Sequence, residues 1–126
     1  DFTRAKDKYE LLTMEGSGGI ICPLRWDDKQ HVILDDLIKD LDLGVLIIAD
    51  AGLGTINAAV LTIEHLQQRQ IPIRGVIFNN YVPDDIMQMD NEKMIVAMTG
   101  IPVVAKVRHG DQELAMDAAE LAGLYR

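Results

Sequence analysis

A run of five residues, Glu15-Gly16-Ser17-Gly18-Gly19, has the composition of a ligand-binding turn. It follows an apolar run, Tyr9–Met14, that has the length of a buried strand of a parallel sheet. Ligands of open α/β sheets bind beyond the carboxyl ends of such strands. Glycines also let backbone N–H groups approach a ligand closely. The run therefore predicts a metal or phosphate site at Glu15, although a strand, a turn and a solvated acid would share this sequence.

A second glycine pair, Gly52-Leu53-Gly54, follows the apolar run Val45–Ala49 and precedes a helical pattern. Strand, tight turn and helix in this order place backbone N–H groups at a helix N-terminus, which suits a carboxylate or a phosphate. The pair lacks the third glycine of a dinucleotide fingerprint, and Gly16–Gly19 lacks the lysine of a P-loop. A tight turn without a ligand remains the alternative.

Two asparagines, Asn79-Asn80, end another apolar run. An asparagine side chain offers both a donor and an acceptor, the pair that can contact an adenine edge, but asparagine is also common in turns. The three histidines are far apart in the sequence and have no metal-ligand spacing. Four methionines are expected to fill the core rather than to form a binding surface: Met87, Met89, Met94 and Met98.

Apolar periodicity divides the chain into alternating strands and helices. The expected strands are Tyr9–Met14, Val45–Ala49, Gly75–Phe78 and Val103–Val107, with a short extended piece at Gly19–Leu24. The expected helices are His31–Leu43 capped by Gly44, Ile56–Arg69, a helix capped by Asp84 or Asp85 that ends at Thr99, and Asp111–Leu124. The alternation predicts an α/β fold with three layers and a mainly parallel sheet.

Composition excludes several classes of protein. The chain has 126 residues, a net charge of -8 and a sequence pI of about 4.7, which argues against a nucleic-acid-binding surface. No apolar run has the length of a membrane span, and the charged N-terminus does not resemble a signal peptide. A single cysteine, Cys22, excludes an internal disulfide framework and fits a reducing compartment.

The number of elements is low for a complete nucleotide-binding domain. The chain also begins almost directly on a strand that needs neighbours on both sides. We therefore expect residues 1–126 to be the C-terminal part of a single larger domain.

Several motifs together resemble dethiobiotin synthetase. They are Glu15–Gly19, Pro23-Leu24, Leu53–Asn57 with Leu61-Thr62 after it, and Gly75–Asn79. The resemblance extends from Tyr9 to about His109. It implies a P-loop NTPase-like fold and a cytoplasmic homodimer that makes dethiobiotin, in biotin biosynthesis, from 7,8-diaminopelargonate, carbon dioxide and ATP with Mg²⁺.

The resemblance also implies roles for individual residues. Glu15 would be a magnesium ligand, and its hard oxygen suits that ion. The residues implied to lie around the nucleotide, its phosphates and the carbamate are Glu15, Gly16, Ser17, Gly18, Asn79, Asn80, Arg108, His109 and Gly110. Among them Asn79 would contact adenine. The residues implied to hold the carboxylate end of the diamine acid, across the dimer interface, are Gly54, Thr55 and Asn57.

The sequence departs from the family in two places. The family's P-loop, its catalytic lysines and a second magnesium carboxylate are absent, so we expect no catalytic residue and no turnover in residues 1–126 alone. Arg108-His109-Gly110 stands where family members often carry a proline close to the adenine. Two other functions remain open: an amidoligase of the cobyrinate synthase type, and a non-catalytic regulatory or assembly domain of the same fold.

Overall fold

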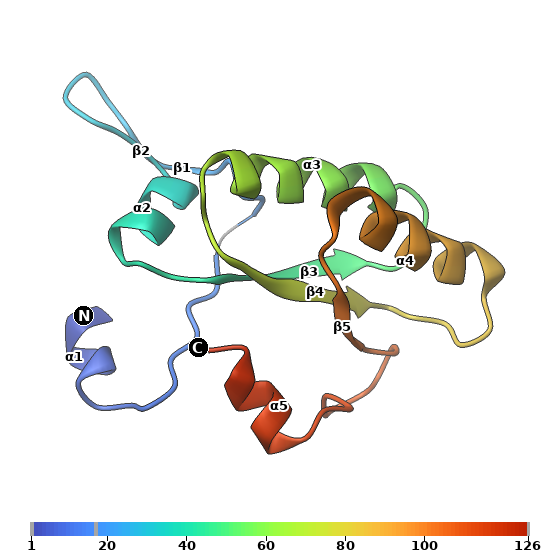
Figure 1. Ribbon diagram of the computed structural model, residues 1–126. Helices are drawn as coiled ribbons and strands as arrows, with labels where there is room; N and C mark the ends of the chain where they lie inside the picture. The colour runs from blue at the N-terminus through green and yellow to red at the C-terminus, as the bar shows by residue number, and fades with distance from the viewer. Residues whose placement is uncertain (1, 17, 126) are drawn as a thin grey trace. The chain divides into compact units, whose positions relative to one another are not determined.

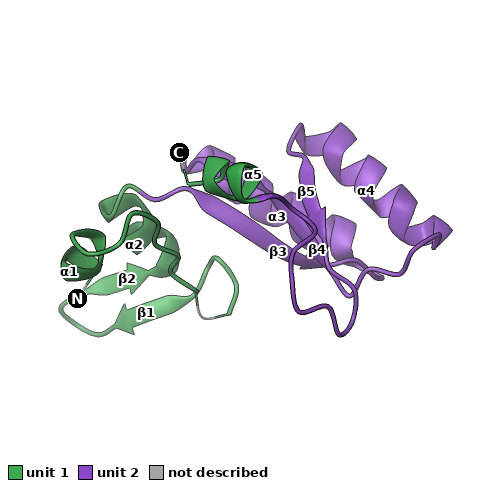
Figure 2. Ribbon diagram, turned by 90° about the horizontal axis from the view of Figure 1, so that it is seen from below, with its two compact units in different colours: residues 1–42, 118–126 green, residues 43–117 purple. Residues whose placement is uncertain are grey.

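The computed structural model describes residues 2–16 and 18–125 of the chain (Figure 1). Ser17, one of the predicted site residues, lies outside the described residues. The chain divides into two compact units, which are residues 1–42 with 118–126, and residues 43–117 (Figure 2). In the part of the chain that the structure describes, no helix is long and apolar enough to cross a membrane.

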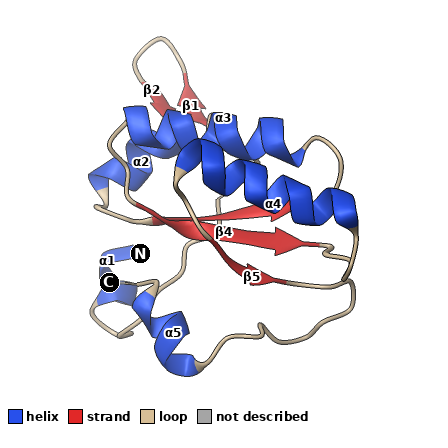
Figure 3. Cartoon of the chain, turned by 45° about the vertical axis from the view of Figure 1, so that its right-hand side comes forward, coloured by secondary structure: helices blue, strands red, loops and turns tan. Residues whose placement is uncertain are grey.

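Residues 43–117 form a parallel sheet with two helices on one face (Figures 1 and 3). The strands lie in the order β3-β4-β5. The elements of this unit are β3 (Val45–Asp50), α3 (Thr55–Gln68), β4 (Ile73–Asn79), α4 (Ile86–Thr99) and β5 (Val103–Lys106). The strands and helices predicted between Val45 and Val107 are therefore confirmed, with small differences at their ends.

The central strand, β4, and the inner sides of the two helices form the core of this unit. The largest fully buried apolar side chains here are Phe78, Ile63, Leu66, Ile95 and Val76. Strand β3 pairs only with β4 among the described strands, and its Ile48 is 62% exposed. Strand β4 is therefore buried on both faces, whereas β3 is not, although its run Val45–Ala49 is apolar throughout.

The ends of α4 follow the expected capping chemistry. The Asp85 carboxylate accepts a hydrogen bond from the Gln88 N–H at 3.0 Å, which satisfies one free donor of the first turn. At the other end, Gly100 adopts a left-handed conformation with φ of 72°, which glycine allows at little steric cost. Asp85 is therefore the cap, and Asp84 is not.

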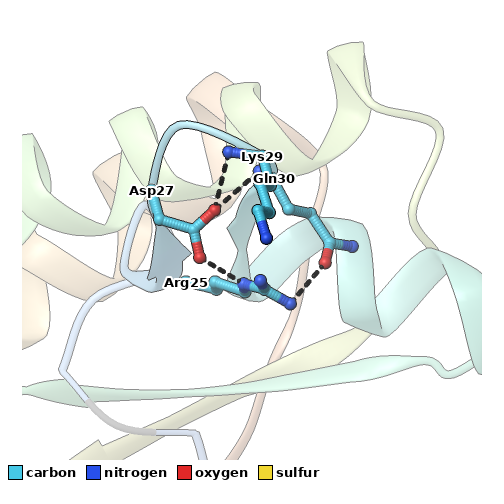
Figure 4. Close-up of polar contacts among 4 residues, drawn as sticks. All are labelled: Arg25, Asp27, Lys29 and Gln30. Carbon is cyan, nitrogen blue, oxygen red and sulfur yellow. Dashed lines mark hydrogen bonds and ion pairs between the residues drawn. The ribbon is translucent and has the colours of Figure 1, made fainter.

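The other unit contains an antiparallel hairpin and short helices. Its described elements are α1 (Phe2–Lys6), β1 (Pro23–Trp26), β2 (His31–Ile33), α2 (Leu34–Asp40) and α5 (Ala118–Gly123). The hairpin turn is organised by the Asp27 carboxylate, which accepts hydrogen bonds from the N–H groups of Lys29 and Gln30 and from Arg25 Nε (Figure 4). Across the hairpin, the Trp26 and His31 rings stack with centroids 4.2 Å apart.

The expected first strand, Tyr9–Met14, is wrong. These residues are irregular and mostly exposed, and no strand among the described residues pairs with them. A strand of a parallel sheet is stable only when neighbouring strands satisfy its backbone N–H and C=O groups. The apolar run alone therefore did not determine its structure.

Two expected helices are shorter than predicted. In the first, His31–Ile33 pairs with β1 instead, and the helix ends at Asp40 with Leu41 as its C-cap rather than at Gly44. In the second, only Ala118–Gly123 is helical, and a turn in which the Asp111 carboxylate accepts a hydrogen bond from the Arg108 N–H stands at the expected start. Pairing with β1 therefore replaces the start of the first helix, and a turn replaces the start of the second.

The expected burial of the four methionines of α4 is also wrong. Their side chains are between 40% and 57% exposed. The helix has apolar residues on every side, so periodicity could not indicate which side faces the core. The structure buries Gln88, Asn91 and Ile95 instead.

Candidate ligand-binding site at the carboxyl ends of the parallel strands

Three chain segments meet where β3, β4 and β5 end. The strands are parallel, so their carboxyl ends lie at one edge of the sheet. The pairing continues past the strands, since the Ala51 N–H donates to the Asn79 carbonyl at 2.8 Å and the Tyr81 N–H donates to the Val107 carbonyl at 2.9 Å. Among the predicted residues, Asn79 ends β4 and Asn80 follows it at this edge. Residues 108–110 follow β5, and the loop that contains Gly54 follows β3.

Asp50, the last residue of β3, connects two of these segments. Its Oδ2 accepts a hydrogen bond from Asn80 Nδ2 at 2.7 Å, and its Oδ1 accepts one from the Gly52 N–H at 2.8 Å. The hydrogen bond from Asn80, and then that from Gly52, hold the pKa of the Asp50 carboxyl below its ordinary value. The carboxylate is therefore ionised at neutral pH.

Asn91 fixes the same loop from the helix side. Its side chain is 8% exposed, and its Nδ2 donates to the carbonyls of Ala51 and Gly52 at 3.0 and 3.2 Å. The loop that leads into α3 is thus held by a side chain from α4 and by the carboxylate of Asp50.

The predicted carboxylate-binding residues lie at the start of α3. Gly54 is its N-cap with φ of 88°, and no side chain caps the first turn. Thr55 is only 5% exposed, and its hydroxyl has no hydrogen-bond partner among the described residues. Backbone N–H groups at an uncapped helix N-terminus favour an anion.

An apolar groove of about 490 Å³ opens beside this helix start. Gly54 and Asn57 line it together with apolar side chains of α3, α4 and the preceding loop, including Leu53, Leu61, Met87 and Met98. Leu53 is 94% exposed. The structure therefore brings Gly54 and Asn57 into one open groove, whereas the Thr55 side chain is buried.

The turn Arg108-His109-Gly110 follows β5 and is exposed. Gly110 has φ of 89°, a conformation that favours glycine. Beside it, the ammonium group of Lys106 lies 5.0 Å from the centre of the Tyr81 ring and 2.6 Å from the Glu92 carboxylate. This edge of the sheet thus carries a lysine that is already paired with an acid.

The glycine run at Glu15 belongs to the other unit. Glu15, Gly16 and Gly18 are exposed. Gly18 has φ of 77°, and a Cβ atom on Gly16 would lie 2.8 Å from Leu34 Cδ2. No group of three or more potential metal ligands occurs among residues 2–16 and 18–125. One exposed carboxylate nevertheless fits Mg²⁺, which often binds through one or two carboxylates together with substrate phosphates.

Three residues of the site were missed at the level of sequence: Asp50, Asn91 and Lys106. Asp50 had a signal, because it directly follows the apolar run of β3. Asn91 had none, since it sits within a helix that has apolar residues on all sides. Lys106 ends a short strand, and nothing in its spacing distinguishes it from a surface lysine.

Comparison with known proteins identifies the class to which this fold and site belong. A family model described as an AAA domain matches residues 1–113, and the chain belongs to this family. The fold predicted from the sequence, an α/β fold of the P-loop NTPase-like type with a mainly parallel sheet, is thereby confirmed.

Individual relatives are more specific. The chain is 50% identical over 103 residues to the ATP-dependent dethiobiotin synthetase BioD of Brachyspira hyodysenteriae, an alignment that covers 82% of this chain and 47% of the relative. A protein of the same name from one strain of Clostridium botulinum is 42% identical over 103 residues, which are 82% of this chain and 45% of that relative. Its counterpart from a second strain is 37% identical over 125 residues, which are 99% of this chain and 54% of that relative. The resemblance to dethiobiotin synthetase is confirmed, and the chain spans about half the length of the curated relatives it matches.

Proposed function

We propose that residues 1–126 form the C-terminal part of the single domain of an ATP- and Mg²⁺-dependent dethiobiotin synthetase. Such an enzyme closes the ureido ring of dethiobiotin from 7,8-diaminopelargonate and carbon dioxide, a step of biotin biosynthesis in the cytoplasm. The observation that carries the proposal is the 50% identity over 103 residues to a protein of that name. The grouping of predicted nucleotide residues at one sheet edge supports it.

In this proposal the ends of β4 and β5 bind the nucleotide. Asn79 contacts the adenine edge through its amide, with Asn80 beside it, and the turn Arg108-His109-Gly110 lies alongside. The placement is supported by the hydrogen bonds that continue the sheet beyond these strands, because they fix the backbone next to Asn79 on both sides. Ligands of open α/β sheets bind in this position.

The glycine run binds the phosphates and the metal. Gly16, Ser17 and Gly18 approach the phosphates and the carbamate with their backbone N–H groups, and Glu15 supplies a carboxylate oxygen to Mg²⁺. When bound, the ion neutralises the negative charge that gathers as a carbamate attacks the γ-phosphoryl group. This chain contributes mainly positioning, since the P-loop lysine that cradles phosphates is not among its residues.

The start of α3 holds the carboxylate end of the diamine acid. An uncapped helix N-terminus with a glycine at positive φ supports this assignment, and so does the buried, unpartnered hydroxyl of Thr55. Gly54 and Asn57 lie in an apolar groove whose exposed side chains, Leu53 foremost, would be covered in a two-fold symmetric dimer. The binding site for the diamine acid, formed mainly by one subunit, would then be completed by this loop of the other subunit.

The test uses the full-length protein that contains this chain. We expect it to form dethiobiotin from 7,8-diaminopelargonate, carbonate and ATP with Mg²⁺, whereas residues 1–126 alone form none. Glu15→Gln should lower Mg²⁺-dependent turnover by orders of magnitude, because a carboxylate at a phosphoryl-transfer metal site is lost. Glu10→Gln, which removes a neighbouring exposed acid, is the matched control and should have no such effect.

Three outcomes would contradict the proposal. Activity of residues 1–126 at the rate of the full-length protein would remove the need for a P-loop. Turnover of an amide-forming substrate and not of the diamine acid would favour a cobyrinate-type amidoligase. Binding of ATP without any turnover would favour a regulatory or assembly domain. Sedimentation tests the dimer, and Leu53→Glu should dissociate it because a charge would enter the groove.

A further inference from the structure

Asp50 makes two hydrogen bonds that reach different parts of the candidate site. One oxygen accepts from the Gly52 N–H, in the loop that leads into α3, and the other accepts from Asn80 Nδ2, in the turn that follows β4. The two partners are separated by 28 residues in sequence, from position 52 to position 80. A single side chain therefore joins the segment proposed to hold the diamine acid to the segment proposed to hold the nucleotide.

The residue types on both sides suit this connection. A Cβ atom on Gly52 would lie 2.9 Å from Asp50 Oδ1, so glycine lets the loop N–H reach the carboxylate. Asn80 has φ of 55°, in the left-handed region where asparagine is tolerated better than most residues. In that conformation its amide reaches back to the end of β3.

We propose that Asp50 is a positioning residue that ties the loop before α3 to the Asn79-Asn80 turn and so fixes the nucleotide contacts and the diamine-acid contacts relative to each other. The inference rests on the proposed function. Asp50 acts through Gly52 and Asn80 and not on a ligand directly, because both its oxygens are engaged by protein donors and its negative charge would repel a phosphate or a carboxylate.

The present connection is a charge-assisted hydrogen bond from an amide to a carboxylate. Asp50→Asn leaves one carbonyl oxygen for the Gly52 N–H, and its amide can pair with Asn80 only if the Asn80 amide turns to present its oxygen. That neutral hydrogen bond is weaker than the charge-assisted one it replaces. Asn80→Asp brings two carboxylates together, which repel each other. In the double variant, the new amide at position 50 can donate to the new carboxylate at position 80, while its carbonyl oxygen still accepts from Gly52. The exchange therefore rebuilds the connection with the roles reversed.

The experiment measures ligand binding by the full-length protein and its three variants. Calorimetric titration gives the dissociation constants of ATP and of 7,8-diaminopelargonate, and amide hydrogen exchange follows the backbone of residues 51–54 and 80–81. Each single variant should weaken both ligands roughly two- to tenfold, the range that loss of one hydrogen bond produces, and should speed exchange in both segments. The double variant should return the hydrogen exchange of both segments and the dissociation constant of 7,8-diaminopelargonate to within about twofold of the unaltered protein. ATP binding should stay weakened, because Asn80 itself is proposed to lie beside the nucleotide.

The control is Asp90→Asn, which removes an exposed acid from α4 in the same unit. It should change neither the dissociation constant of either ligand nor the amide hydrogen exchange of the two segments. Additive losses of exchange protection and of diamine-acid binding in the double variant would overturn the inference, since Asp50 would then contribute independently of Asn80. Weakening of only one ligand by Asp50→Asn would overturn it as well. If the unaltered protein binds neither ligand, the proposed function fails, and the recovery or loss of exchange protection in the double variant still decides whether the connection exists.

Discussion

Asn91 offers a sharp test of how the candidate site is held in place. Its buried amide donates to the carbonyls of Ala51 and Gly52. A net contribution of about 0.5–1.5 kcal/mol for each hydrogen bond predicts that Asn91→Ala lowers the free energy of unfolding by roughly 1–3 kcal/mol. Because both bonds end on the loop before α3, binding of the diamine acid should weaken along with stability.

Asn91→Asp changes little in shape and reverses the chemistry. A carboxylate oxygen would face two carbonyl oxygens, so at neutral pH this variant should be less stable than Asn91→Ala. The surroundings disfavour the charged form and raise the pKa of the introduced carboxyl in the folded state above about 3.9, the value in the unfolded chain. The loss is then complete above the folded pKa and shrinks as pH falls towards about 4, where the protonated carboxyl can donate.

Urea unfolding of the full-length protein between about pH 3.5 and 7 measures the stability losses of Asn91→Ala and Asn91→Asp. Amide hydrogen exchange of residues 51–54 reports whether the loop before α3 is loosened. Gln88→Ala is the control, because Gln88 is also buried on α4 but its Oε1 accepts from the Val82 N–H, far along the chain from the loop. Gln88→Ala should lower the free energy of unfolding without changing the amide hydrogen exchange of residues 51–54. Equal stability of Asn91→Asp and the unaltered protein at pH 7 would refute the assignment of the amide as a double donor.

Three further predictions address single residues in the full-length protein. Asn79→Ala should raise the KM for ATP more than it lowers kcat, because adenine contacts are alike in the ground and transition states. An equal loss of kcat/KM with ATP and with a pyrimidine nucleotide would show that Asn79 shapes the turn and does not contact adenine. Thr55→Val replaces a buried, unpartnered hydroxyl and should raise the free energy of unfolding by about 1 kcal/mol while weakening the diamine acid; unchanged binding in calorimetry would assign the hydroxyl to packing alone. Hydrogen bonds from Arg25, and then from two backbone N–H groups, lower the pKa of Asp27 in the folded state, so the Asp27 contribution to hairpin stability should be complete above pH 3.8, the ordinary pKa, and be lost as pH falls through the lower pKa of the folded state. NMR shifts of the Lys29 and Gln30 amides should follow this titration, and Asp27→Asn should abolish it.

The parts of the fold that the sequence predicted correctly depend on local signals. The runs Val45–Ala49 and Gly75–Phe78 are apolar, bounded by turn residues and long enough for a strand. Asp85 caps the helix that it precedes with its carboxylate, and Gly100, which has no Cβ atom, ends that helix. The helix after Gly54 was likewise predicted within a residue at each end.

The failures depend on contacts between distant residues. Tyr9–Met14 has the composition of a strand, but a strand exists only if another pairs with it. The exposed methionines of α4 could not be assigned from a helix that is apolar on all sides. The hydrogen bond between Asp50 and Asn80 needs two strands to be neighbours in register, which the pairing of Asp50 with Asn79 provides and which no spacing in the sequence reveals.

The stacked pair in the hairpin has a consequence for spectroscopy. Trp26 is the only tryptophan of the chain, and it is 66% exposed beside His31 in the unit that excludes residues 43–117. Its emission therefore reports loss of the hairpin, whereas far-ultraviolet circular dichroism reports mainly the helices α3 and α4. Two unfolding curves that do not coincide would show that the hairpin is lost at a different point from the helices of residues 43–117.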